Sequence, residues 1–155
     1  MLVTLAAHRV EFVIIGGLAG AAHDVGWPTT DVDIVIDTAH ENMAALHSAL
    51  QELDAEYNTP HSPPIVPDLR RLRSLGGPQL FRTKHGRLDV LKEAGGETYE
   101  TLTRDAVTAV YGTIEVRCAS LEALVRMKLA ANRPKDQAVV RRLQEALASK
   151  KNERE

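Results

Sequence analysis

The feature that most constrains the fold is a short apolar run that two adjacent glycines stop. Phe12–Ile15 is brief, apolar and rich in β-branched residues, which predicts a buried strand. Gly16 and Gly17 end this run, and the small residues of 18–25 predict a helix. Residues 32–37 alternate polar and β-branched side chains, which predicts a second strand. Residues 12–37 therefore predict a strand, a glycine turn, a helix and a second strand.

The remaining residues predict a small mixed sheet flanked by helices, an α/β (α+β) fold. Residues 58–67 contain four prolines and no periodicity, so we expect a loop that is mobile or acts as a lid. One domain is expected over residues 1–148, with a disordered tail at 149–155. Further helices are predicted at 2–9, 39–53, 120–131 and 134–148, strands at 69–75, 80–83 and 87–91, a loop and short helix at 95–105, and a hairpin about Gly112 at 109–116.

Composition excludes several classes of protein. The single cysteine, Cys118, rules out an internal disulfide and a cysteine-rich zinc cluster. Apolar runs are too short for a membrane span or a signal peptide, so a cytoplasmic location is expected. The net charge of -2 argues against coating of nucleic acid by bulk electrostatics. Six basic residues still form either a phosphate-facing surface or a solvated strand edge: Arg70, Arg71, Arg73, Arg82, Lys84 and Arg87.

Two acidic residues share one face of the second predicted strand. The strand period of two places Asp31 and Asp33 about 7 Å apart on that face. Side by side they would raise each other's pKa unless a divalent cation neutralised them. Magnesium suits such an all-oxygen ligand set. The alternative is a solvated strand end with no ligand.

The glycine pair adds a second element of a site. Gly16 and Gly17 lie between a strand and a helix, where backbone N–H groups and the helix dipole favour phosphate. The alternative is a tight turn. Together with the acidic pair, the glycines predict a phosphate cradle beside a metal site.

These motifs resemble the signature of nucleotidyltransferases of the DNA polymerase β type: Gly16-Gly17 at the start of a helix, then Thr29-Thr30-Asp31-Val32-Asp33. Gly86–Leu91 resembles the strand that supplies the third carboxylate of this superfamily, Asp89. Residues 120–136 resemble the C-terminal segment of bacterial AbiEii-like toxin–antitoxin nucleotidyltransferases. The resemblance spans roughly residues 10–147.

The resemblance implies a minimal nucleotidyltransferase fold and a magnesium-dependent transfer of a nucleoside monophosphate from an NTP, such as ATP, to a hydroxyl. It implies two Mg²⁺ ions, with Mn²⁺ as a substitute. The acceptor would be an RNA or tRNA end, a protein or a small molecule, and the chain a toxin with a cognate antitoxin. The implied metal-binding and catalytic residues are Asp31, Asp33 and Asp89, the nucleotide-binding residues are Gly16, Gly17, Thr29, Thr30 and Lys128, and the weaker candidates are Arg87, His23 and Asp136.

Lys128 can also be considered from helical periodicity. It falls at the centre of an apolar stripe made by Leu121, Leu124, Val125 and Leu129. An inward lysine needs an anionic partner, which is a triphosphate, Asp136 or both at once. Asp136 could otherwise be a first-turn residue favoured by the helix dipole.

Related sequences often carry a basic residue in place of Trp27 and an acid in place of Val139, which leaves substrate choice open. Two other classes remain as alternatives. A strand, glycine turn, helix and strand over residues 12–37 also describe a dinucleotide-binding unit, although Gly16-Gly17-Leu18-Ala19-Gly20 lacks the Gly-x-Gly-x-x-Gly spacing. The other alternative is a noncatalytic nucleotide-binding antitoxin or regulator with the same fold.

Overall fold

A mixed seven-stranded sheet forms the centre of the molecule, with strand order β3-β4-β5-β2-β1-β9-β8. The computed structural model describes residues 1–27, 29–74 and 76–155. The strands of the main sheet are β1 (Phe12–Ile15), β2 (Val32–Ile36), β3 (Glu56–Tyr57), β4 (Gln79–Thr83), β5 (Gly86–Leu91), β8 (Val107–Tyr111) and β9 (Ile114–Cys118). β6 (Glu93–Ala94) and β7 (Glu97–Thr98) pair separately. The predicted α+β class with a mixed sheet is confirmed.

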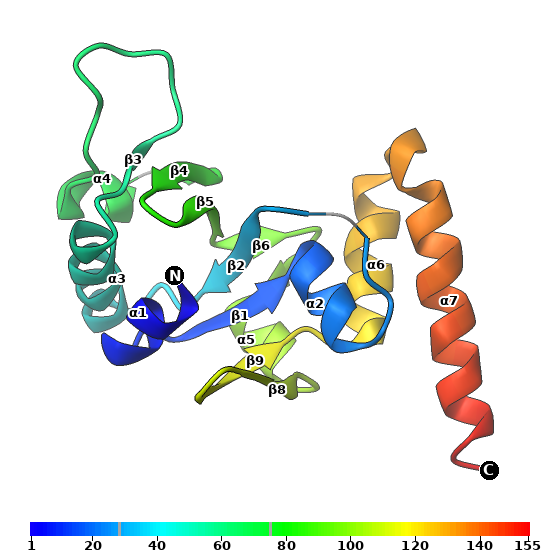
Figure 1. The fold of residues 1–155 in the computed structure, drawn as a ribbon. Helices are drawn as coiled ribbons and strands as arrows, with labels where there is room; N and C mark the ends of the chain where they lie inside the picture. The colour runs from blue at the N-terminus through cyan, green and yellow to red at the C-terminus, as the bar shows by residue number, and fades with distance from the viewer. Residues whose placement is uncertain (28, 75) are drawn as a thin grey trace.

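Helices cover the sheet at both ends (Figure 1). α1, α3 and α4 lie together at one end, and α6 and α7 lie side by side at the other, with α2 between α6 and the central strands. The bounds are α1 Leu2–Ala7, α2 Gly16–Ala22, α3 His40–Glu52, α4 Leu69–Ser74, α5 Tyr99–Thr103, α6 Leu121–Ala131 and α7 Gln137–Asn152, with a 3-10 turn at Pro134–Asp136. The central strands carry the core, since Val13, Ile14, Ile34 and Val35 have no exposed surface.

The pairing of β1 with β2 excludes one of the alternatives. The two strands are antiparallel, with Ile15 opposite Asp33. A dinucleotide-binding unit needs parallel strands joined by a crossover helix. α2 instead begins directly at Gly16, two residues before the predicted start. After α2 the chain returns, and β2 runs antiparallel to β1. The dinucleotide-binding interpretation is therefore wrong.

The strand predicted at 69–75 is wrong, because residues 69–74 form α4. Asp68 explains the difference: its Oδ1 accepts a hydrogen bond of 2.8 Å from the backbone N–H of Arg71, as a helix-capping residue does. Leu72 is the one buried residue of this short helix. Residue 75 lies outside the described residues. The hairpin formed by β4 and β5, and that formed by β8 and β9 about Gly112, agree with the predictions.

The last helix is longer than its predicted end at residue 148. α7 continues to Asn152, so the first four residues of the predicted tail are helical. Lys150 fixes this extension to the domain by donating a hydrogen bond of 3.1 Å to Nδ1 of His23. No helix in the described ranges is long and apolar enough to cross a membrane.

Candidate active site

Two carboxylates meet on neighbouring strands. Parallel pairing of β2 with β5 sets Asp33 opposite Asp89, 56 positions later in the sequence. Residues opposite each other in a sheet point to the same face, and the two carboxyl groups are hydrogen-bonded to each other. Such a contact requires one of the pair to hold a proton, unless a cation replaces it.

The surroundings of the pair favour the neutral form. Burial raises the pKa of Asp33 to about 6, with further contributions from the charge of Asp89, the hydrogen bond that Asp33 donates to Asp89, and the charge of Asp31. The charge of Lys128 opposes this shift. Burial also raises the pKa of Asp89, against the hydrogen bond from Asp33 and the charge of Arg87. The raised pKa of both carboxyls favours a bound proton at each, which a cation could replace.

The donor set at this pair fits a divalent metal ion. Asp89 Oδ1 is buried and has no hydrogen-bond partner among the residues that the structure describes, although buried polar atoms are normally satisfied. The backbone at Gly16 has φ of +70°, and a Cβ there would lie 2.6 Å from Asp33 Oδ2. Glycine thus keeps the carboxylate accessible from the β1–α2 turn. Carboxylate oxygens of this kind suit magnesium.

Asp31 is close enough for its charge to act on both aspartates, but its own carboxylate contacts other residues. Its Oδ2 lies 3.6 Å from Nη1 of Arg87, and its Oδ1 accepts a hydrogen bond of 3.3 Å from Thr30. Within the described part of the chain, no three His, Cys, Asp or Glu side chains are grouped so as to hold a metal ion. The structure thus brings together two of the three predicted carboxylates, and the third is bound to Arg87.

A cavity of about 560 Å³ opens over the Asp33–Asp89 pair. Its apolar wall comes from β4, β5 and α6, and its charged side chains are the two aspartates, Glu93, Lys128 and Arg133. No residue of 58–67 is among the described lining residues, and in Figure 1 this loop projects beyond β3, so it is not placed as a lid. The full lining is Ile15, Gly16, Asp33, Pro78, Leu80, Asp89, Leu91, Glu93, Ala94, Gly95, Leu124, Met127, Lys128, Ala131 and Arg133.

Lys128 reaches the cavity from α6 and has an anionic partner. Its Nζ donates to Oδ1 of Asp136 at 3.1 Å, and Nε of Arg133 donates to the other oxygen of Asp136 at 2.8 Å. Burial raises the pKa of Asp136, but these two cations outweigh it and hold that pKa below its ordinary value. The predicted ion pair between Lys128 and Asp136 is therefore present.

The apolar stripe of α6 differs from the predicted one. Leu129 is 53% exposed, and Met127 and Ala123 are buried with Leu121 and Leu124. The buried face of α6 is rotated about the helix axis relative to the predicted one, so Lys128 lies at the edge of that face. At such a position the aliphatic part of a lysine can pack while its ammonium reaches a cavity.

Gly17, Thr29 and Thr30 lie beside the cavity rather than among its described lining residues. Gly17 is buried under the segment that precedes β2: a Cβ there would lie 2.6 Å from Thr29 Cγ2. Thr29 Oγ1 accepts from the backbone N–H of Asp31 at 3.2 Å. These contacts help to fix the segment that precedes Asp31 and the start of β2.

His23 does not belong to this site. It is 7% exposed, and Nε2 donates to the backbone oxygen of Ala119 at 2.8 Å. It lines a different cavity, of about 360 Å³, with Leu147 and Lys150. Sequence reasoning also missed Arg133 and Glu93, which line the main cavity. Arg133 falls inside the resembling segment 120–136, but no periodicity marks it.

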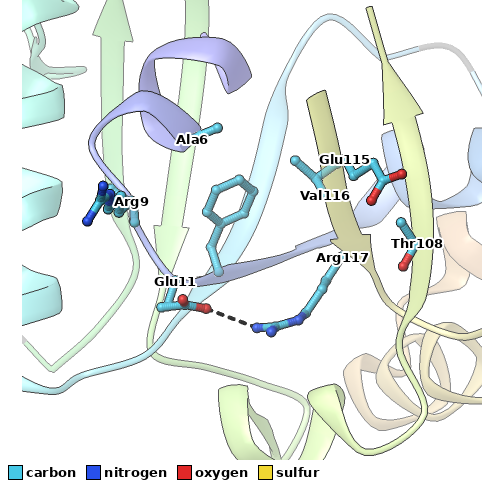
Figure 2. Close-up of a pocket in the computed structure, with 9 residues that line it drawn as sticks. Ala6, Arg9, Glu11, Thr108, Glu115, Val116 and Arg117 are labelled. Atoms are coloured by element: carbon cyan, nitrogen blue, oxygen red, sulfur yellow. Dashed lines mark hydrogen bonds and ion pairs between the residues drawn. The ribbon is translucent and has the colours of Figure 1, made fainter. Parts of the chain in front are cut away.

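Another cavity, of about 470 Å³, lies between the α1–β1 connection and the β8–β9 hairpin (Figure 2). Figure 2 shows the side chain of Arg117 reaching Glu11, with which it forms an ion pair of 2.9 Å. Both side chains are about half exposed. The acid that pairs with Arg117 is solvated, and no two facing carboxylates like Asp33 and Asp89 are found among the described residues that line this cavity.

Comparison with known proteins identifies the fold. No protein-family profile and no curated protein matches the chain. Solved structures do match. The lincomycin-bound lincosamide antibiotic adenylyltransferase LnuA shares 14% identity, with a TM-score of 0.60 over 94% of this chain and 92% of that one. The antibiotic-resistance factor ANT(2'')-Ia shares 18% identity in its solution structure, with a TM-score of 0.59 over 96% and 79%.

ANT(2'')-Ia in complex with adenylyl-2''-tobramycin also matches, at 16% identity and a TM-score of 0.56 over 98% of this chain and 88% of that one. At such identities the likeness concerns architecture. The mixed sheet with flanking helices is similar to the fold of nucleotidyltransferases. Closer kinship with AbiEii-like proteins stays a prediction.

Proposed function

We propose that this chain is a magnesium-dependent nucleotidyltransferase that moves a nucleoside monophosphate from an NTP to a hydroxyl group. The observation that carries this proposal is the half-buried Asp33–Asp89 pair in the lining of a cavity, where Oδ1 of Asp89 has no hydrogen-bond partner among the described residues. The fold it shares with two antibiotic nucleotidyltransferases supports the same reaction class.

Asp33 and Asp89 would hold the metal, and Asp31 would join them after exchanging Arg87 for the cation. Bound there, Mg²⁺ would supply the positive charge that lowers the pKa of an acceptor hydroxyl and offsets the charge of the triphosphate. Mn²⁺ meets the same oxygen ligands. A second ion is part of the proposal, held by the same aspartates and the phosphates.

The chain's own groups would bind and orient the reactants. Gly16 leaves room for the triphosphate beside Asp33, and Lys128 and Arg133 offer cationic partners at the cavity wall. The acceptor oxygen bonds to the α-phosphorus, the bond from that phosphorus to the leaving pyrophosphate breaks, and Asp89 is the candidate base for the hydroxyl proton. Catalysis is then mainly positioning and charge stabilisation.

We infer that the acceptor is a small molecule. Of the basic cluster at 70–87, Arg82 pairs with Glu56 at 2.9 Å, Lys84 with Asp54 at 4.0 Å and Arg87 with Asp31. Three of the six cluster residues are thus neutralised by neighbouring acids, which reduces the positive charge that could follow an RNA backbone. LnuA was solved with lincomycin bound, and ANT(2'')-Ia was solved in complex with adenylyl-2''-tobramycin. A tRNA end or a protein acceptor is an outcome that the experiment below distinguishes.

The test is to incubate the protein with Mg²⁺, four NTPs labelled at the α-phosphate and a cell extract, then separate small molecules, RNA and protein. Label is expected in the small-molecule fraction, and Asp89→Asn should reduce it roughly a hundredfold or more while leaving the fold intact. Label in RNA or protein would reassign the acceptor. Binding of NTP without any transfer would favour the noncatalytic antitoxin or regulator, and no NTP binding would refute the proposal.

The toxin assignment rests on the resemblance of residues 120–136 alone. If the chain is a toxin, its expression should arrest growth, Asp89→Asn should abolish the arrest, and a cognate antitoxin should relieve it. Normal growth on expression of an active enzyme would refute this role.

A further inference from the structure

Trp27, the single tryptophan of the chain, lies against α2 on two glycines. A Cβ on Gly20 would lie 2.5 Å from Trp27 Cζ3, and one on Gly17 would lie 3.0 Å from Trp27 Nε1. Gly17 and Gly20 are three residues apart and so share one face of the helix. Because neither glycine has a side chain, the indole ring packs directly against this face of α2.

The ring is also in contact with the lysine of α6. Nζ of Lys128 lies 5.3 Å from the centre of the Trp27 ring, within the range of a cation–π contact. The same Nζ donates to Asp136, and the Lys128 side chain is only 16% exposed. Lys128 is therefore restrained from two sides, by a carboxylate and by an uncharged aromatic face.

We propose that Trp27 is a positioning residue that holds the ammonium of Lys128 at the cavity wall for the triphosphate. This inference rests on the proposed nucleotidyl transfer. It assigns a role to a residue outside the described lining of the cavity.

Asp136 and Trp27 would respond differently if the ammonium of Lys128 moved to bind a phosphate. Asp136 keeps the guanidinium of Arg133 at 2.8 Å, so it does not become an unpaired buried charge. Trp27 carries no charge, so it attracts the ammonium without neutralising it. A lysine ordered in this way loses less side-chain freedom on binding than a free one.

The experiment measures the dissociation constant for radiolabelled NTP by equilibrium dialysis with Mg²⁺. Trp27→Leu should weaken binding about fivefold, the ratio that about 1 kcal/mol of cation–π attraction gives. Trp27→Phe keeps an aromatic face and should bind within about twofold of the wild type. In a Lys128→Met background, Trp27→Leu should have no further effect, because its action passes through that lysine.

A merely structural role would make the two substitutions additive, and additivity would overturn the proposal. So would equal weakening by Trp27→Phe and Trp27→Leu. Failure of the wild type to bind any NTP would instead refute the proposed function, and this inference with it.

A measurement without nucleotide tests the contact in variants that keep Trp27, so it does not depend on the folding of Trp27→Leu. Lys128→Met should change the fluorescence emission of Trp27, whereas Lys135→Met, an exposed lysine beside Asp136, should not. Identical emission of the wild type and Lys128→Met would contradict the contact itself.

Discussion

Neutralising Asp33 should stabilise the metal-free protein. The pKa of this carboxyl is raised from 3.8 to about 6, chiefly by burial and by Asp89. The folded state therefore holds the proton more tightly than the unfolded chain, and the resulting stability is present below about pH 4 and lost as pH rises through about 6. Above that range, the folded protein bears the cost of an ionised carboxylate beside another.

The cost can be worked from the pKa. Its folded value lies about two pH units above the ordinary one, and each is worth about 1.36 kcal/mol, which gives roughly 3 kcal/mol. Partial solvent access and sharing of the proton with Asp89 reduce this to about 2 kcal/mol. Asparagine has nearly the same shape, and its amide can donate to Asp89. We therefore expect Asp33→Asn to raise the melting temperature at pH 7.5 by roughly 4–8 °C.

Thermal unfolding from pH 4.5 to 8 in EDTA measures this effect. The wild type should lose stability across the range relative to Asp33→Asn. Magnesium should restore it in the wild type by binding the folded state, and much less in the variant. Glu115→Gln is the matched control, because Glu115 is exposed and has no ion pair among the described residues. A variant less stable than the wild type in EDTA at pH 7.5 would refute the reasoning.

Three further substitutions test other contacts. Gly16→Ala places a Cβ 2.6 Å from Asp33 Oδ2 at a backbone φ of +70°. It should lower the free energy of unfolding by about 1–2 kcal/mol in denaturant and weaken magnesium binding roughly tenfold. Unchanged magnesium affinity in calorimetry would contradict the proposed metal site. Ser120→Ala removes the side-chain cap of α6, and should lower stability by about 1 kcal/mol, about 2–4 °C in a melting scan; no shift would show that the cap is not needed. Arg87→Gln removes the cation 3.6 Å from Asp31, so magnesium titration at low salt should show binding up to about fivefold tighter, whereas weaker binding would mean that Arg87 supports the site.

Much of the local structure could be predicted because its signals are local. The apolar run of β1 and the glycines after it place the first strand and the start of α2 near their observed positions. α4 was missed because it is only six residues long, so the helical spacing of Leu69 and Leu72 occurs in it only once and the cap at Asp68 was not recognised. Leu129 was misplaced because a wheel drawn for one helix does not show which arc α7 covers.

The site itself depends on contacts that no local pattern contains. Asp33 and Asp89 meet only because β5 lies next to β2 and parallel to it, and this strand order is a property of the whole sheet. The family resemblance grouped the two residues, but it gave neither the Asp31–Arg87 pair nor the place of Trp27 over Lys128. Such pairings follow from the three-dimensional arrangement of side chains distant in sequence.

The location of the transferred phosphorus tests nucleotidyl transfer most directly. Parallel reactions with NTP labelled at the α- or the γ-phosphate, with Mg²⁺ and the small-molecule fraction, should place the α-label on the acceptor and release the γ-label as pyrophosphate. Both signals should vanish with EDTA and with Asp89→Asn. Transfer of the γ-label to the acceptor, or release of single phosphate alone, would contradict nucleotidyl transfer and reassign the Asp33–Asp89 site to another phosphate chemistry.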